Sequence, residues 1–200
     1  MPYVLTVDQH DSQRTTDAVD AAVATLATTP TLLGFHRTVG DEFQGLLDDP
    51  VSVLAVILFL MRTQQWHVGL GVGPVDRPLP PDGDPTRARG PAFVAARAAV
   101  ERAKSDPHHL GVVAPGASEE ADDVKAVLDL LDTVRQGRTD AGWEVTDLAG
   151  AGLTQAAAAE RLAISRQAVQ QRLRTAGWAV EEAVRPALVR LLARAGAAAR

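Results

Sequence analysis

Two aspartates near the ends of expected strands have the type and spacing for metal chemistry. Asp8 falls late in an apolar, β-rich segment, and Asp41 falls in a Gly-Asp-Glu turn between two further β-rich segments. We expect the turn to lie beside the end of the first strand, so that the carboxylates form the hard-oxygen pair that Mg²⁺ prefers. Such an ion can bridge nucleotide phosphates. Acidic residues also cap and solvate hairpin tips, and this alternative stays open.

A second set of polar residues belongs to residues 153–174, LTQAAAAERLAISRQAVQQRLR. This segment predicts a helix over Gln155–Leu162, a turn over Ala163–Ser165 and a second helix that follows. Thr154 and Ser165 are the expected N-caps of the two helices, because their hydroxyls can accept a bond from a free backbone N–H. The turn position that usually carries Gly holds Ala163, which would be strained at positive φ. The pattern is that of a helix-turn-helix, in which the second helix enters the major groove of DNA.

The second helix of this motif has one apolar side and one polar side. Val169 and Leu173, four residues apart, are expected to face the first helix, where only a small side chain such as Ala159 fits. Glutamine pairs with the adenine edge and arginine with guanine or phosphate. The expected DNA-binding residues are Ser165, Arg166, Gln167, Gln170, Gln171 and Arg174. An ordinary alanine-rich amphipathic helix pair is the alternative.

Charge is distributed unevenly along the chain. Residues 151–200 hold eight Arg and three Glu, a net charge of +5, whereas residues 1–150 hold 12 basic and 22 acidic residues, a net charge of −10. The whole-chain value of −5 hides this difference. A basic region on an acidic body is typical of nucleic-acid binding, and double-stranded DNA is the expected partner.

The order of the expected elements defines the fold that must position Asp8 and Asp41. Strands are predicted at 3–9, 32–39, 43–47 and 66–75, and helices at 14–28 and 51–63, from periods of two and of 3.6 residues. This βαββαβ order predicts an α+β, ferredoxin-like domain in which the first and third strands are central.

The rest of the chain is expected to be mainly helical. Residues 74–91 hold six of the twelve prolines and should form an extended loop. A helix at 91–104, a strand at 110–113 and helices at 118–135, 139–150 and 178–195 follow, the last broken or kinked at Pro186. We therefore expect one domain at 1–117 and a helical region at 118–200, with the helix-turn-helix at 153–176.

Several other chemistries are excluded or weak. The chain has no Cys, so disulfides and thiolate metal sites are excluded. Val53–Met61, the longest apolar run, is too short to span a membrane, and no signal peptide is visible, so we expect a cytoplasmic protein. His108 and His109 are adjacent and would point to opposite faces of a strand, so they cannot chelate together. His10 and His36 could approach the carboxylates, although structural histidines are commoner.

Two further patterns lack a chemical role at this stage. The Gly69–Gly73 segment lacks the Lys-Ser/Thr of a phosphate loop, so its glycines are expected to allow close backbone packing. Ser12 lacks the histidine and acid that would make it a nucleophile. No catalytic residue is assigned.

Four short segments resemble the bacterial SatD family. They are Val7-Asp8, Asp11-Ser12, the block Val39–Leu47 that contains GDEFQGLL, and Gly90–Phe93. The resemblance covers roughly residues 1–175 and implies a palm-like N-terminal domain followed by a helix-turn-helix.

More distantly, the layout is similar to the palms of class III nucleotide cyclases and diguanylate cyclases. That resemblance implies a nucleotide ligand and makes Arg97 a candidate phosphate contact, unless Arg97 is a solvated residue of its helix. Phe93 occupies the position of the cyclase's catalytic Asn, and Val39 precedes Gly40 where diguanylate cyclases have a second Gly. Both departures count against an active cyclase.

We expect a DNA-binding protein, a transcriptional regulator whose palm-like domain senses a ligand, dimerises or does both. The alternatives are a Mg²⁺-dependent nucleotide-processing enzyme targeted to DNA, and an adaptor whose palm is only a scaffold. A homodimer is expected from the apolar stripe of the last helix, unless that helix folds back on the N-terminal domain. The stripe comprises Val180, Val184, Leu188, Leu191 and Leu192.

Overall fold

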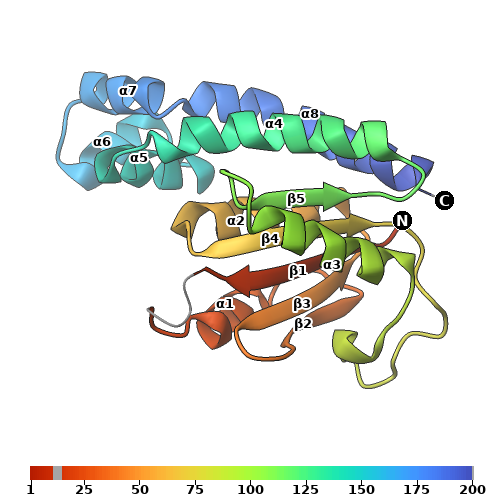
Figure 1. The fold of residues 1–200 in the computed structure, drawn as a ribbon. Coiled ribbons are helices and arrows are strands. Elements are labelled where there is room, and N and C mark those ends of the chain that lie inside the picture. The colour runs from red at the N-terminus through yellow and green to blue at the C-terminus, as the bar shows by residue number, and fades with distance from the viewer. Residues whose placement is uncertain (11–14, 200) are drawn as a thin grey trace. The chain divides into compact units, whose positions relative to one another are not determined.

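The computed structural model describes residues 1–10 and 15–199 of the chain (Figure 1). Asp11, Ser12 and the expected helix start at Arg14 lie outside the described residues. The fold is α+β, as predicted. The strands are β1 (Tyr3–Gln9), β2 (Leu33–Arg37), β3 (Glu42–Leu47), β4 (Trp66–Val72) and β5 (Leu110–Val113). The helices are α1 (Val19–Leu26), α2 (Pro50–Thr63), α3 (Pro91–Ala103), α4 (Ser118–Gln136), α5 (Asp140–Gly150), α6 (Gln155–Leu162), α7 (Arg166–Thr175) and α8 (Trp178–Ala198), with a 3₁₀ turn, η1, at Pro85–Arg87.

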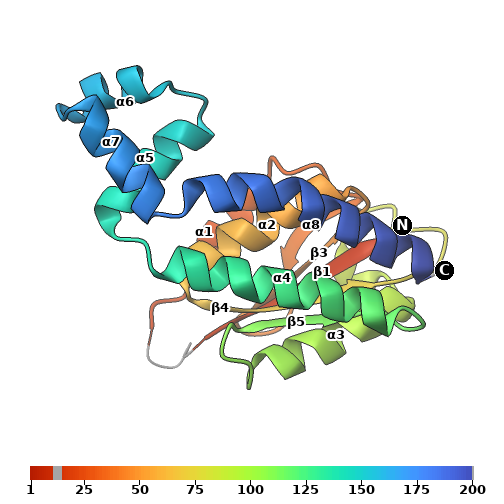
Figure 2. The same cartoon turned by 90° about the horizontal axis from the view of Figure 1, so that it is seen from above.

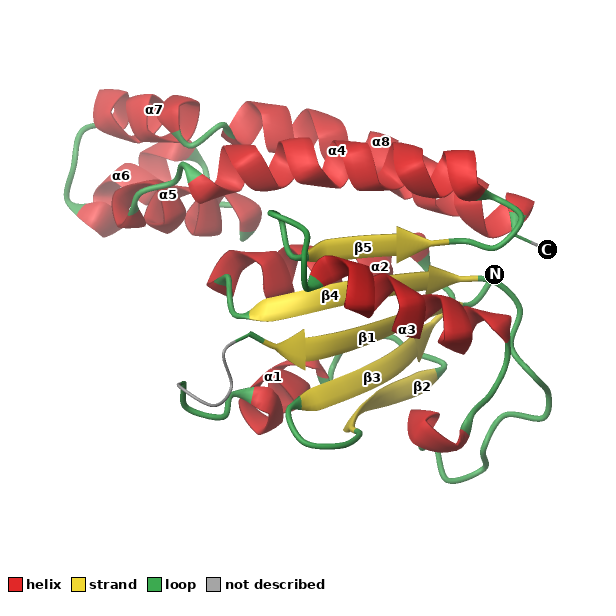
Figure 3. Ribbon diagram, in the orientation of Figure 1, coloured by secondary structure: helices red, strands yellow, loops and turns green. Residues whose placement is uncertain are grey.

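The five strands form one mixed sheet in the order β2-β3-β1-β4-β5 (Figure 3). β1 runs antiparallel to both β3 and β4, whereas β5 runs parallel to β4. Among the first four strands, β1 and β3 are central, so this part of the prediction is confirmed. β5 extends the sheet beside β4, which leaves β1 in the middle of the five strands.

Helices cover both faces of the sheet: α3 lies on one face, and α1 and α2 lie on the other (Figures 1 and 2). The glycines of β4 allow α3 to approach closely. A Cβ atom added at Gly69 or Gly71 would lie closer than 3.0 Å to backbone atoms of α3, including those of Ala96 and Val100. The prediction that these glycines serve close backbone packing is confirmed.

α1 begins at Val19, five residues later than expected from residue 14. The buried side chain of Gln9 explains the late start. It accepts a 2.9 Å bond from Ala18 N and donates a 2.8 Å bond to Thr16 O. These bonds hold Thr16 O and Ala18 N outside the helix, so that Ala18 contributes only its carbonyl to the helical ladder, as the acceptor from Ala22 N.

The chain divides into two compact units. Unit 1 comprises residues 1–129 and 188–200, and unit 2 comprises residues 130–187. The division differs from the expected boundary at 117/118, because it falls within α4 and again within α8. Leu128 is buried in unit 1, and so are Leu188 and Leu192. The ends of both long helices therefore supply core residues to the sheet-containing unit.

The last helix corrects two expectations. α8 runs from Trp178 to Ala198 with Pro186 inside it, so the helix is not broken there, whereas the alternative of a kink at Pro186 stays a prediction. Two residues of the apolar stripe expected at a dimer interface, Leu188 and Leu192, are buried within unit 1. The alternative in which this helix folds back on the N-terminal part therefore holds for its last eleven residues, Leu188–Ala198. Among the described residues, no helix has the length and apolar character needed to cross a membrane.

Candidate functional site

Unit 2 contains a three-helix cluster with the spacing of a helix-turn-helix. α5, α6 and α7 share a core of Val145, Ala158, Ala159 and Val169. Leu148, Leu162, Ile164 and Leu173 pack against that core. The expected inward direction of Val169 and Leu173 is confirmed, and α5 is the supporting helix expected at 139–150.

Local hydrogen bonds fix the start of each helix. Thr154 Oγ1 accepts from Ala157 N at 3.2 Å, and Ser165 Oγ accepts from Ala168 N at 3.1 Å. Ala163 has a left-handed backbone with φ of 52° and ψ of 41°. An L-residue other than Gly, Asn or Asp is disfavoured there. Both caps and the strained turn position lie where the sequence predicts them.

One face of α7 remains open to solvent. The six residues expected to bind DNA are all exposed: Ser165, Arg166, Gln167, Gln170, Gln171 and Arg174. Arg174 donates to the Gln171 side chain, whereas Arg166 has no ion pair within the part of the chain that the structure describes. The arrangement offers amide and guanidinium groups from one helix to a partner.

Unit 2 as a whole is not basic, although residues 151–200 carry a net charge of +5. Residues 130–187 hold seven Arg and seven Asp or Glu, so the unit is formally neutral. Its positive charge is concentrated in residues 155–175, which hold four Arg and one Glu. Electrostatic attraction to DNA would therefore come from α6 and α7 alone.

Three other arginines of unit 2 surround a carboxylate that the sequence analysis missed. Glu181 is fully buried, and its oxygens lie 2.7 Å from Arg135, 2.6 Å from Arg138 and 2.6 Å from Arg185. The guanidinium carbons of Arg135 and Arg138 lie 4.9 and 4.8 Å from the centre of the Trp143 ring. Burial acts to raise the pKa of Glu181, but the neighbouring arginines outweigh it and hold that pKa below its usual range. These contacts join α4, α5 and α8 of the unit.

In unit 1, the structure brings Asp8 and Asp41 into the same neighbourhood. Gln9 N donates a 3.1 Å bond to Asp41 O, which holds the hairpin tip against the end of β1. Burial raises the pKa of Asp8, while Lys104 lowers it and Asp41 raises it further. The carboxylate of Asp41 is therefore close enough to act on that of Asp8, as their expected proximity requires.

Cations already lie beside these carboxylates. Lys104 Nζ is 4.0 Å from Asp8 Oδ2. The neighbouring Glu42 is buried and accepts two bonds from Arg97, of 2.5 and 3.0 Å. Within the described ranges, neither Asp8 nor Asp41 belongs to a group of three side chains at metal-ligand spacing. A Mg²⁺ ion at the pair would have to compete with Lys104.

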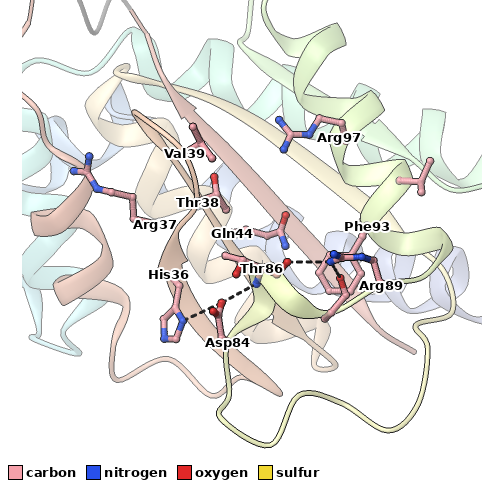
Figure 4. A pocket seen from close by; sticks show the side chains of 12 residues that line it. His36, Arg37, Thr38, Val39, Gln44, Asp84, Thr86, Arg89, Phe93 and Arg97 are labelled. Carbon is pink, nitrogen blue, oxygen red and sulfur yellow. Dashed lines mark hydrogen bonds and ion pairs between the residues drawn. The ribbon is translucent and has the colours of Figure 1, made fainter.

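Arg97 also lines a pocket of about 780 Å³ in unit 1 (Figure 4). The pocket is formed by β2, β3, η1 and the start of α3. It is lined by His36, Arg37, Thr38, Val39, Gln44, Asp84, Thr86, Ala88, Arg89, Phe93, Val94 and Arg97. Three arginines and a single carboxylate line the pocket. Arg97 is already paired with Glu42, and Arg37 with Asp17 and Asp20, whereas Arg89 bonds only to backbone carbonyls among the described residues.

The pocket combines fixed polar groups with exposed apolar ones. Asp84 accepts a 2.8 Å bond from Thr86 N and lies 3.5 Å from His36 Nδ1. Arg89 donates to Thr86 O at 3.0 Å, so its guanidinium is held at the rim. Val39 is 86% exposed and lines the same pocket. Such a lining suits a ligand that carries both an anion and a flat apolar part.

Of these lining residues, Arg97 was expected from the sequence to contact a ligand, whereas His36, Arg37 and Arg89 were not expected to share a pocket with it. Phe93, which stands at the position of the cyclase's catalytic Asn, is half-buried against the core and lines the pocket. The available signal was the run of prolines at 74–91, because that loop carries η1 and Arg89 over the β2–β3 hairpin. Its contact with the hairpin is a tertiary one, seen in the 3.1 Å bond from Gln44 Nε2 to Pro85 O.

Comparison of the chain with protein-family models, with curated proteins and with solved structures finds no match. The resemblance to the SatD family and to cyclase palms remains a prediction based on the residues quoted for it. The geometry of α5–α7 and of the arginine-lined pocket therefore carries the functional argument.

Proposed function

We propose that this chain is a cytoplasmic DNA-binding protein that acts as a transcriptional regulator, with α7 in the major groove. The observation that carries the proposal is the exposed face of α7, where two arginines and three glutamines project from a capped helix behind a three-residue turn. Glutamine and arginine are the side chains that read adenine and guanine edges by paired hydrogen bonds. The N-terminal part of a recognition helix is the part that contacts bases, which favours Arg166, Gln167 and Gln170.

A gel-shift series with the full chain tests this proposal. The probe is a pool of random duplexes, enriched over several rounds at physiological salt. The Arg166→Ala/Arg174→Ala double variant should lose at least about tenfold in affinity for the selected duplex, since each base contact contributes roughly 1–3 kcal/mol. Arg190→Ala/Arg194→Ala is the matched control, because it removes the same charge from exposed positions of α8 in unit 1. Equal binding by the two double variants, or no enrichment with wild type, would reject α7 as a recognition helix.

We propose that unit 1 is the sensory part of this regulator and binds a nucleotide in the arginine-lined pocket. Its first four strands have the order and directions of a ferredoxin-like palm, which supports the sequence-based resemblance. The pocket volume of about 780 Å³ falls in the usual range for small-molecule sites. Arg89, whose bonds are to backbone carbonyls, can neutralise phosphate directly, whereas Arg37 and Arg97 would do so while keeping their pairs with Asp17, Asp20 and Glu42. Phe93 with Val94 offers an apolar surface for a base.

Thermal shifts test the ligand. Purine and pyrimidine nucleoside triphosphates should raise the melting temperature of wild type, while the matching nucleosides, which lack phosphate, should not. Arg89→Ala should reduce the shift, because Arg89 lines the pocket and its own bonds, within the described ranges, are only to the backbone carbonyls of Thr86 and Ala88. Equal shifts with nucleosides and triphosphates would exclude phosphate recognition by the arginines.

Catalysis is the second candidate, and the proximity of Asp8 and Asp41 is the observation that favours it. A Mg²⁺ ion between them would make unit 1 a nucleotide-processing enzyme. Incubation of the protein with Mg²⁺ and a nucleoside triphosphate, followed by chromatography of the products, distinguishes sensing from turnover. Turnover that Asp41→Asn abolishes would establish the enzyme.

A homodimer is part of the proposal, because two recognition helices can engage two half-sites about one DNA turn apart. The buried part of α8 is not available for it. In the described part of unit 2, the exposed large apolar side chains are Leu130 (70%) and Val180 (52%). Leu130→Asp/Val180→Asp should convert the dimer to a monomer in light scattering. A dimer that survives the double variant would place the interface in unit 1.

A further inference from the structure

Three histidines in or next to three neighbouring strands meet at one end of the sheet in unit 1. His10 directly follows β1, His67 lies in β4, and His109 directly precedes β5. The pairing places Asp8 opposite His67 and Val68 opposite Leu110, so His109 continues the register beside His67. Because side chains alternate along a strand, His10 shares the face of Asp8 and His67.

The three imidazoles form a nearly symmetrical group. Each pair of ring centroids, His10–His67, His10–His109 and His67–His109, is separated by 5.0 Å. One nitrogen from each ring lies within 4.8 Å of the other two. An ion bound at about 2.0–2.1 Å by three tetrahedrally placed nitrogens brings them to roughly 3.3 Å from one another, a change within reach of side-chain rotation.

Two nitrogens of this cluster are buried without a partner. The His67 side chain is 8% exposed, and its Nδ1 atom has no hydrogen-bond partner among the described residues. The Nδ1 atom of His109 is also buried and has no hydrogen-bond partner among the described residues. Burying a polar atom without a hydrogen bond costs free energy, so each such atom in a native structure calls for an explanation. A metal ion, which the nitrogens would ligate, supplies one.

The surroundings of His67 are those of a metal ligand. Its ring hydrogen-bonds to the backbone of Ala103, and because Nδ1 is unpartnered that bond is made by Nε2. A second-shell carbonyl of this kind fixes the tautomer and orientation of a ligating histidine. Ala103 is the last residue of α3, so the negative end of that helix dipole faces the same place.

We propose that His10, His67 and His109 bind a borderline transition-metal ion of the Zn²⁺ class, with one coordination position left open. Imidazole nitrogens suit Zn²⁺, Cu²⁺ or Ni²⁺, whereas Mg²⁺ prefers oxygen. Three protein ligands and an open position are the arrangement of catalytic rather than structural zinc. The nearby charge of Lys104 is balanced, since its Nζ lies 3.0 Å from Glu101 and 4.0 Å from Asp8. This site is separate from the proposed DNA-binding and nucleotide-binding functions and does not depend on either.

Metal titration of the full chain, dialysed against a chelator, tests the proposal. Calorimetry with Zn²⁺ should give one ion per chain, and Co²⁺ should give the visible absorption bands of a low-symmetry, four- or five-coordinate site. His10→Gln and His67→Gln should each weaken binding at least tenfold. His36→Gln is the matched control, because His36 is a half-exposed histidine outside the cluster and should leave the titration unchanged.

Three results would overturn the metal site. Failure of wild type to bind Zn²⁺ below 100 µM (roughly 5.5 kcal/mol) would overturn the proposal. An unchanged affinity of His10→Gln for Zn²⁺ would also overturn it. His10→Gln keeps the test valid if His67→Gln does not fold, and circular dichroism checks that His10→Gln itself is folded. Displacement of Zn²⁺ by millimolar Mg²⁺ would instead place the ion on the carboxylates and also overturn it.

Discussion

The hydroxyl of Tyr3, in the first strand, donates a 2.9 Å hydrogen bond to the backbone carbonyl of Leu192, in the last helix. Both side chains are buried, and burial of the phenol raises the pKa of Tyr3 to about 12. The same helix approaches this strand closely at Gly196, where an added Cβ atom would lie 2.5 Å from the Tyr3 oxygen. The end of α8 is therefore a structural part of unit 1, and removing it would damage the sheet-containing core.

Replacement of Leu192 by Ala should destabilise the protein by about 2–5 kcal/mol, since it leaves a cavity at a fully buried site. Urea unfolding followed by fluorescence measures the change. Leu191→Ala is the control, because the neighbouring side chain is only half-buried and should cost clearly less. Equal losses for the two variants would contradict the assignment of this helix end to the core of unit 1.

Ala163→Gly should stabilise unit 2 by roughly 0.5–1 kcal/mol. The left-handed backbone at φ 52° strains an alanine, whereas glycine adopts it freely and loses only part of the gain to chain entropy. Ala176→Gly, at a right-handed C-cap, is the control and should not stabilise. The readout is the melting temperature by circular dichroism, and a fall in that temperature for Ala163→Gly would show that the turn has another conformation.

The helix-turn-helix geometry could be predicted because its signals are local. Thr154 and Ser165 cap their helices through bonds to residues three positions later, and Val169 faces the core at helical spacing. The strained turn at Ala163 was also predictable, since the motif needs a left-handed residue at that place. The central position of β1 followed from the order of elements, which depends on strand and helix periods rather than on particular contacts.

The parts that escaped prediction depend on contacts between distant residues. Because His108 and His109 are adjacent in the sequence, the two were not expected to bind one metal ion together. His109 instead lies beside His10 and His67, which are distant from it in the sequence. The net charge of +5 in residues 151–200 suggested a basic domain. The structure instead assigns Arg190 and Arg194 to unit 1 and surrounds buried Glu181 with Arg135, Arg138 and Arg185.

Glu181→Gln should destabilise the protein by about 3–5 kcal/mol at pH 7, because it leaves buried arginines without their counter-charge. Because the folded pKa of Glu181 is lower than its unfolded value of about 4.5, the stability that it contributes is complete above pH 4.5. It is lost as the pH falls through the folded pKa. The gap between wild type and Glu181→Gln should therefore narrow below pH 4.5.

Urea unfolding at pH 7 and at pH 3.5 measures this gap. Glu182→Gln is the control, since that neighbouring carboxylate is half exposed and its 3.4 Å contact with Arg185 is a surface pair. It should change stability little at either pH. A gap for Glu181→Gln that stays constant between the two pH values would mean that folding does not lower the pKa of Glu181.

Millimolar Mg²⁺ should raise the melting temperature of wild type if the carboxylates of Asp8 and Asp41 share an ion, since the ion relieves their repulsion. Asp41→Asn should abolish the rise, whereas Asp48→Asn, which changes an exposed carboxylate outside the pair, should leave it intact. Lys104→Met should enlarge the rise, because it removes the cation that lies 4.0 Å from Asp8. If Mg²⁺ leaves the melting temperature of both wild type and Lys104→Met unchanged, Asp41 serves only the hairpin tip and the enzymatic alternative for unit 1 is rejected.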